Sequence, residues 1–213
     1  METLFYRPGA CALGPHILLE WLGIEYNAIN APRDQSFLAI NPSGAVPALQ
    51  LEDGTIVTQC TAIFQYLCEA YNRPDLVGGS SIEARTEVWK WCSFLTGDLH
   101  PAFFPLFVPF RYTTDSSEES HSKIREAAVQ LVSQKLTIIE NHLQDRDFFL
   151  KEGLSVVDCY AVPMLRWAGL MLPDGRSKWP VVDAFYRRMV NDKGVKSALI
   201  LSLIHISEPT RPY

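Results

Sequence analysis

The apolar pattern of the chain changes at residues 72–81, and this change constrains the fold more than any other feature. Before it, short runs of strand character alternate with runs of helical periodicity. The segment itself, NRPDLVGGSS, concentrates Pro, Gly and Ser, which is typical of a linker. After it, apolar residues recur only at helical spacing. The sequence therefore predicts an α/β domain over residues 1–78 and an all-helical domain over residues 83–200.

The first domain is predicted to contain a mixed sheet and helices. A short apolar strand ends in an Arg-Pro-Gly turn, and a helix with apolar residues at three- and four-residue steps runs from there to Gly23. An Asp53-Gly54 turn between two apolar runs is the clearest hairpin signal in the chain. The predicted elements are strands at 3–6 and 25–31, a helical turn at 36–40, a hairpin pairing 48–51 with 55–57, and a helix over 60–71.

Four helices are predicted beyond the linker from the same periodicity. Ser155 and Asp158 have the spacing of a capping box at the start of one of them, and we expect this pair to be structural. We expect Cys68, Cys92 and Cys159, which fall within helices, to be core residues. The predicted helices span 82 to about 100, 120–144, 156–171 and 181–191.

Composition argues against several classes of function. No apolar run among the 213 residues approaches the roughly 18 that a membrane-spanning helix needs, and the start METLFYRPG lacks a secretory signal. A net charge of −5 with dispersed Lys and Arg argues against nucleic acid. The five cysteines and five histidines form no CxxC or HExxH motif, which indicates reduced thiols and no metal site. We expect a cytoplasmic protein that binds neither a membrane nor nucleic acid.

The C-terminal segment is a candidate non-native tail. Residues 201–211, LSLIHISEPTR, match one reading frame of a transposase adapter used in preparing sequencing libraries. The alternative is a native segment that happens to contain Ile-His-Ile. We interpret residues 201–213 as a non-native tail, assign no function to them or to His205, and expect the last residues of the natural chain to be missing.

Cys11 is the first candidate functional residue. It follows a strand and opens a helix, where free backbone N–H groups and the helix dipole favour a thiolate. The alternative is a small buried apolar residue, and position alone does not decide between the two. Because no second cysteine lies close in the sequence, we expect that redox use of Cys11 would need a thiol from outside the chain.

Two further features belong to the first domain. Pro47 directly precedes a predicted strand, so the Val46-Pro47 bond is a candidate cis peptide that exposes the backbone of Val46 to an extended ligand. Gln59 and Cys60 begin a helix, where the side chain of Gln59 and the first N–H groups suit a carboxylate. The alternatives are an ordinary loop proline and an ordinary helix cap.

The helical domain offers two patterns. One is a stripe on a single helix face, formed by residues at three- or four-residue steps: Trp89, Ser93, Thr96, Gly97 and His100. This stripe is predicted to border a ligand cleft, and the alternative is a solvated helix face. The second pattern is a set of four aromatic residues. They are candidates for the lining of an apolar pocket, the alternative is that they belong to the core, and we expect at least half of them to be core. This set is Phe103, Phe104, Phe107 and Trp167.

Several motifs together resemble one protein family, the cytosolic glutathione transferases, and within it the bacterial beta-like group with cysteine at the active-site position. The resemblance covers residues 1–199. Its motifs are FYRPGACALGPHI, NPSGAVPALQL, TQCTAIFQYL, WCSFLTGDLHPAFFPLF and SVVD, in this order. The resemblance implies a thioredoxin-like N-terminal domain followed by an all-helical C-terminal domain, in a homodimer.

The resemblance also implies roles for single residues toward glutathione, the expected co-substrate. Val46, in the Pro47 segment, pairs with the cysteinyl backbone of glutathione, Gln59 and Cys60 hold its γ-glutamyl end, and Arg33 holds its glycine carboxylate. Cys11 lies beside its sulfur, with Ser93 and His100 near this thiol and His100 exchanging a proton with it. Phe104, Phe107 and Trp167 line the pocket for the electrophile.

The implied activity is detoxifying conjugation of glutathione to small hydrophobic electrophiles, exchange of its thiol with disulfides, or both. A cysteine at the active-site position favours exchange and peroxide reduction over fast conjugation, because it can form a mixed disulfide with glutathione. Two alternatives remain. One is a glutathione-dependent thiol–disulfide oxidoreductase or peroxidase, and the other is a non-catalytic glutathione-binding protein of the same fold.

Overall fold

The computed structural model describes residues 1–203, and four of its strands form one mixed sheet in the order β2-β1-β3-β4. β1 (Thr3–Tyr6) runs parallel to β2 (Asn27–Asn30) and antiparallel to β3 (Ala48–Gln50). β4 (Ile56–Thr58) pairs antiparallel with β3, which is the hairpin that the Asp-Gly turn predicts. The observed strands agree with the predicted ones to within a few residues at each end.

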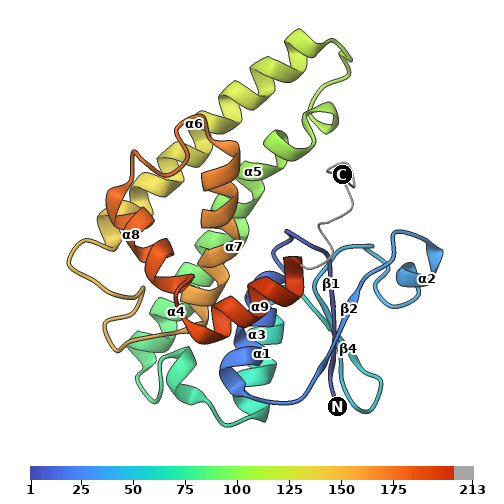
Figure 1. The fold of residues 1–213 in the computed structure, drawn as a ribbon, viewed down its shortest axis with the longest axis vertical. Coiled ribbons are helices and arrows are strands. Elements are labelled where there is room, and N and C mark those ends of the chain that lie inside the picture. Colours follow the sequence, from blue (N-terminus) through green and yellow to red (C-terminus); the bar gives the residue numbers. More distant parts are fainter. Residues whose placement is uncertain (204–213) are drawn as a thin grey trace.

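Helices cover both faces of this sheet (Figure 1). α1 (Leu13–Leu22) and α3 (Cys60–Ala70) lie on one face, and the short α2 (Gln35–Leu38) lies on the other. Side chains of β1 alternate accordingly: Leu4 and Tyr6 join the core under α1 and α3, whereas Phe5 packs with Phe37 of α2.

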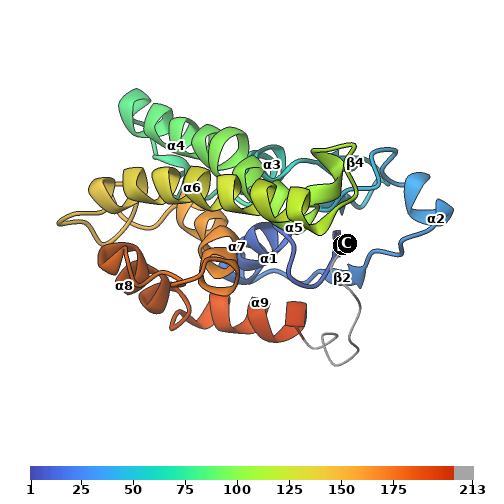
Figure 2. The ribbon, with the colours of Figure 1, turned by 90° about the horizontal axis from the view of Figure 1, so that it is seen from above.

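Beyond residue 81 the described chain is helical (Figure 2). The predicted helix starting at residue 82 does not stop at 100: α4 (Ile82–Phe94) continues through a π-helical turn (Leu95–Leu99) into α5 (His100–Phe107). Pro101 lacks an N–H and interrupts the regular bonding pattern, which favours the wider turn before it. The remaining helices are α6 (Glu118–His142), α7 (Val156–Met171), α8 (Pro180–Met189) and α9 (Lys193–Leu203).

The capping box predicted at the start of α7 is present. The Asp158 carboxylate is fully buried and accepts hydrogen bonds from the backbone N–H of Ser155 at 2.7 Å and from that of Phe149 at 2.9 Å. The side-chain hydroxyl of Ser155 also donates to it, at 2.8 Å. Asp158 therefore fixes the loop before α7 as well as the first turn of the helix.

α1 is the element shared by the sheet and the helical part. Its buried residues Ile17, Leu18 and Leu19 belong to one core with α7 and α9, and these two helices contact α1 more than any other helix does. Figure 2 shows α1 and α7 side by side. Within residues 1–203, no helix has both the length and the apolar character needed to cross a bilayer.

α9 is an element that the sequence analysis did not predict, and it enters the segment interpreted as a tail. Leu201 to Leu203 continue this helix, and the Ser202 hydroxyl lies 2.8 Å from Nδ1 of buried His16 on α1. His205 and the other residues after Leu203 lie outside the described part of the chain.

Candidate functional site

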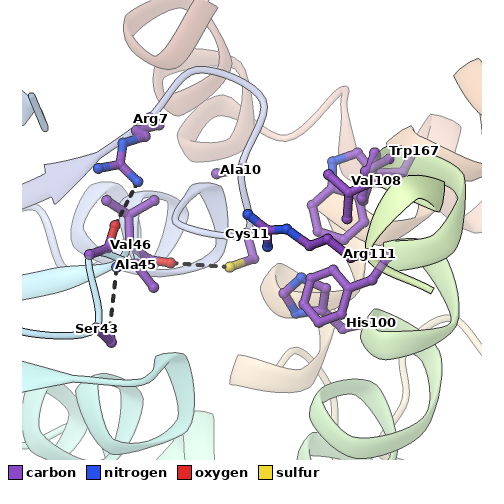
Figure 3. Close-up of a pocket in the computed structure, with 13 residues that line it drawn as sticks. Arg7, Ala10, Cys11, Ser43, Ala45, Val46, His100, Val108, Arg111 and Trp167 are labelled. Atoms are coloured by element: carbon purple, nitrogen blue, oxygen red, sulfur yellow. Dashed lines mark hydrogen bonds between the residues drawn. The ribbon is translucent and has the colours of Figure 1, made fainter. Parts of the chain in front are cut away.

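A cleft of about 350 Å³ lies between the sheet unit and the helical part, and Cys11 is at its centre (Figure 3). One wall comes from the turn after β1 and from residues 43–46. The opposite wall comes from α5, the turn that follows it, and Trp167 of α7. The cleft thus brings together segments that are far apart in the sequence.

Cys11 lies in the turn between β1 and α1, as predicted from the sequence. Cys11 is 8% exposed, and its thiol donates a hydrogen bond to the Val46 carbonyl, with 3.6 Å between sulfur and oxygen. α1 has no side-chain cap at its start. The thiol therefore faces the cleft from a helix start whose polar backbone is not covered by a capping side chain.

The Val46-Pro47 peptide is cis, which confirms the candidate cis bond. Pro47 is buried at the start of β3, whereas Val46 is partly exposed and lines the cleft. The Asn41 side chain donates to the Ala45 carbonyl at 2.6 Å. The loop that contains Val46 is therefore held before this residue by the Asn41 hydrogen bond and after it by the buried Pro47.

Arg7 is a site residue that the sequence analysis missed. Its guanidinium donates to the carbonyls of Gly44 at 2.8 Å and of Pro32 at 3.0 Å, and it lies 5.2 Å from the centre of the Phe37 ring. Arg7 also lines the cleft. The sequence did contain a signal for this role, because Arg7 is a charged residue that directly follows β1, four positions before Cys11.

The opposite wall is aromatic. His100 contacts Phe104 and Trp167, with ring centres 4.9 and 5.0 Å apart, and Phe107 meets Trp167 edge to face at 5.3 Å. Phe104, Phe107 and Trp167 line the cleft as expected, whereas Phe103 is fully buried in the core. The Trp167 indole N–H donates to the Gly9 carbonyl at 2.7 Å, so α7 is joined directly to the Cys11 turn.

His100 also lines the cleft, on the side opposite Val46 (Figure 3). Burial among aromatic rings lowers its pKa to about 4, because the charged imidazolium is poorly solvated there. At neutral pH the imidazole is uncharged. It is therefore a weak base in the cleft and does not bring a positive charge to the sulfur.

Arg111 is a second residue that the sequence analysis missed. It is exposed in the turn after α5, and its side chain extends across the cleft toward Cys11 (Figure 3). Together with Arg7 it makes the cleft positive, since none of the described residues that line it is acidic. Arg111 lies four residues beyond the motif that ends at Phe107, which is why the motif did not indicate it.

Gln59 and Cys60 lie at the start of α3 but differ in exposure. Gln59 is exposed with a backbone φ of 71°, an uncommon conformation for a non-glycine residue. The Cys60 side chain is 5% exposed, and its sulfur lies 3.8 Å from the Cys11 carbonyl oxygen. The Cys60 thiol is therefore buried beside Cys11, whereas Gln59 is exposed.

Arg33 and Ser93 do not line this cleft. Arg33 is exposed and lines a neighbouring depression of about 410 Å³, which shares Arg7 and Gly44 with the cleft. Ser93 is exposed on α4 and lines neither cavity. No cluster of three or more residues suited to a metal ion occurs within residues 1–203.

Known proteins similar to this chain share one family. Residues 9–70 match the family described as the glutathione S-transferase N-terminal domain, and residues 122–188 match the corresponding C-terminal domain. A Xanthomonas campestris relative, Glutathione S-transferase GST-4.5, is 33% identical over 202 residues, which are 92% of this chain and 96% of the relative.

Two solved structures are similar over nearly the whole chain. A sphingomonad glutathione S-transferase complexed with glutathione is 30% identical, with a TM-score of 0.82, and the match covers 94% of this chain and 98% of the other. A bacterial beta class glutathione S-transferase of Sphingomonas chungbukensis is 32% identical, with a TM-score of 0.80 and the same coverage.

Proposed function

Because this chain belongs to the glutathione S-transferase family, we propose that the cleft at Cys11 holds glutathione together with a second substrate. The chain is a glutathione transferase, an enzyme with glutathione as its co-substrate. One observation carries the proposal for this cleft: a thiol, an exposed backbone edge at a cis-proline and an aromatic wall line the same cavity.

Glutathione binds along the sheet side of the cleft in this proposal. Its cysteinyl backbone pairs with Val46 as an added strand, and its sulfur then lies beside the Cys11 thiol. Its γ-glutamyl carboxylate meets Gln59 and the first backbone N–H groups of α3, including that of Cys60. Arg33 binds the glycine carboxylate from the neighbouring depression, and Ser93 borders the glutathione site from α4.

The second substrate binds against Phe104, Phe107 and Trp167. These apolar rings exclude water and suit a small hydrophobic electrophile, which the glutathione thiolate attacks. The proposed role of His100 in conjugation is proton exchange with the sulfur, and because its pKa of about 4 makes the neutral imidazole a weak base, it holds the thiol proton only transiently. Supporting this role, His100 lines the cleft together with Cys11.

Thiol exchange is a second candidate activity, and the Cys11 thiol in the cleft favours it. In this reaction the Cys11 thiolate attacks a glutathionylated disulfide, forms a mixed disulfide with glutathione and releases the other thiol. A serine or tyrosine at this position cannot form that intermediate. Peroxide reduction would use the same thiol.

We propose four further properties. The protein is a homodimer, which sedimentation or light scattering tests directly. It acts in the cytoplasm, where its five free cysteines stay reduced, and cell fractionation checks this location. Its cellular role is detoxification. Its two domains are formed by residues 1–78 and by residues 83–200.

The experiment is a comparison of two substrates with the wild-type enzyme and Cys11→Ala. A chlorinated aromatic electrophile reports conjugation, and a glutathionylated peptide reports exchange. We expect both activities in the wild type and loss of exchange in Cys11→Ala. Binding of glutathione without turnover of either substrate would instead indicate a non-catalytic protein, and absence of glutathione binding would contradict the proposal.

A further inference from the structure

The structure brings a second thiol to Cys11, contrary to the expectation that a partner thiol comes only from outside the chain. Cys60 is distant in the sequence, but its sulfur lies 3.8 Å from the Cys11 carbonyl oxygen. The neighbouring Cys11 thiol also raises the pKa of Cys60. Both thiols are free and almost completely buried, with 8% of Cys11 and 5% of Cys60 exposed.

We propose that Cys60 is the resolving thiol of this enzyme: it attacks the mixed disulfide between Cys11 and glutathione and forms an internal Cys11–Cys60 disulfide. The inference rests on the proposed glutathione exchange at Cys11. It assigns to Cys60 a covalent role in addition to the backbone contact proposed above.

The reaction balances with oxidised glutathione as the oxidant. In the first step the Cys11 thiolate attacks oxidised glutathione, and one glutathione leaves as a thiolate. In the second step Cys60 sulfur bonds to Cys11 sulfur, the bond from Cys11 to glutathione breaks, and the second glutathione leaves with the proton that Cys60 loses. The protein is thereby oxidised by two electrons, and oxidised glutathione is reduced to two molecules of glutathione.

The position of the two thiols suits this step. Cys11 lines the cleft, where the proposed glutathione sulfur lies, whereas Cys60 does not line it and is buried on the protein side of Cys11. Attack on a disulfide sulfur proceeds opposite to the leaving sulfur. In this proposal Cys60 attacks from the buried side of Cys11, and glutathione leaves toward the cleft.

The surroundings of Cys60 set the speed of the step. Burial raises the pKa of the Cys60 thiol well above its usual value, and the Cys11 and Cys159 thiols raise it further. A hydrogen bond from the Tyr160 hydroxyl lowers this pKa, and Tyr160 itself accepts a hydrogen bond from Thr96 at 3.2 Å. Because only the thiolate attacks, resolution by Cys60 becomes faster as pH rises.

The test is a time course of intact protein mass after addition of oxidised glutathione, at two alkaline pH values. The wild type should first gain one glutathionyl group and then lose it, ending two hydrogens lighter than the reduced protein. Cys60→Ala should keep the adduct. Cys68→Ala is the matched control, since it removes another buried cysteine of the same helix, and it should behave like the wild type.

Peptide mapping in the Cys68→Ala background identifies the bond, because Cys60 is then the remaining cysteine of α3. The expected product is a Cys11–Cys60 cross-link. If the wild type and Cys60→Ala both retain the adduct, the resolving role is wrong, while glutathione exchange at Cys11 stands. If neither protein forms an adduct on Cys11, the proposed exchange fails and the resolving role with it. Circular dichroism of each variant confirms that it is folded.

Discussion

His100 lies between Phe104 and Trp167 at the edge of the cleft, and its protonation has consequences for stability. Its folded-state pKa is about 4, below the usual value of 6.5, because of burial. The unfolded chain therefore binds the proton more tightly than the folded chain between these two values. Stability from this group is complete above about pH 6.5 and is lost as pH falls toward 4.

We predict that His100→Phe reduces the acid sensitivity of the fold. A single such group contributes at most about 1.4 kcal/mol per pH unit within that window. Denaturant unfolding at pH 7 and pH 5 measures the effect, and the free energy of unfolding of the variant should fall less than that of the wild type. His16, whose pKa burial also lowers to about 4, remains in both proteins and keeps part of the pH dependence. An identical fall in both proteins would exclude a role of His100.

Arg7 is expected to matter for glutathione binding through the loop that it holds. Arg7→Ala leaves the carbonyls of Gly44 and Pro32 without their donor, so the Val46 backbone loses its fixed position. Loss of one such bond corresponds to about 1.4 kcal/mol, or roughly tenfold weaker binding. Calorimetry measures this, with Arg125→Ala on the surface of α6 as control. Unchanged affinity of Arg7→Ala would show that the loop does not depend on this residue.

At the scale of elements, α7 begins at a buried capping box that also fixes the preceding loop. Asp158→Ala removes acceptors for the N–H groups of Ser155 and Phe149, both in buried surroundings. We predict a loss of about 3 kcal/mol in the free energy of unfolding, measured with denaturant. Asp158→Asn keeps one acceptor and should lose less. A loss below about 0.5 kcal/mol for Asp158→Ala would contradict this role of the capping box.

Short sequence patterns predicted most of the helices and strands, but they did not predict how these elements pack against one another. The Asp53-Gly54 hairpin, the cis Val46-Pro47 bond and the Ser155–Asp158 cap depend on a few neighbouring residues, so the sequence was sufficient for them. The π-helical turn before Pro101 depends on the bonding of a whole helix, and apolar spacing alone did not indicate it.

Contacts between distant segments explain what was missed in the site. Arg7 reaches Pro32 and Gly44, and Cys60 meets Cys11, only because β1, α1 and α3 pack as they do. Sequence spacing contains no signal for such pairs. The sequence did indicate Cys11 and His100, which fall in motifs, and Trp167, which belongs to the predicted aromatic set, and these three line the same cleft.

At the scale of the whole molecule, α1 is covered by the sheet on one side and by α7 and α9 on the other. A fragment of residues 1–78 would therefore expose the apolar face of α1. We predict that this fragment does not fold alone and that the whole chain unfolds in one transition, which circular dichroism and denaturant unfolding can test. A stably folded fragment, or two separate transitions of the chain, would show that the proposed domains are independent.

We propose that glutathione binds between the two parts of the chain with its sulfur at Cys11. A crystal structure of the protein with glutathione measures this directly. We expect glutathione in the cleft, its cysteinyl backbone paired with that of Val46, and its sulfur in contact with the Cys11 sulfur. Glutathione bound elsewhere, or bound in the cleft with its sulfur turned away from Cys11, would contradict it.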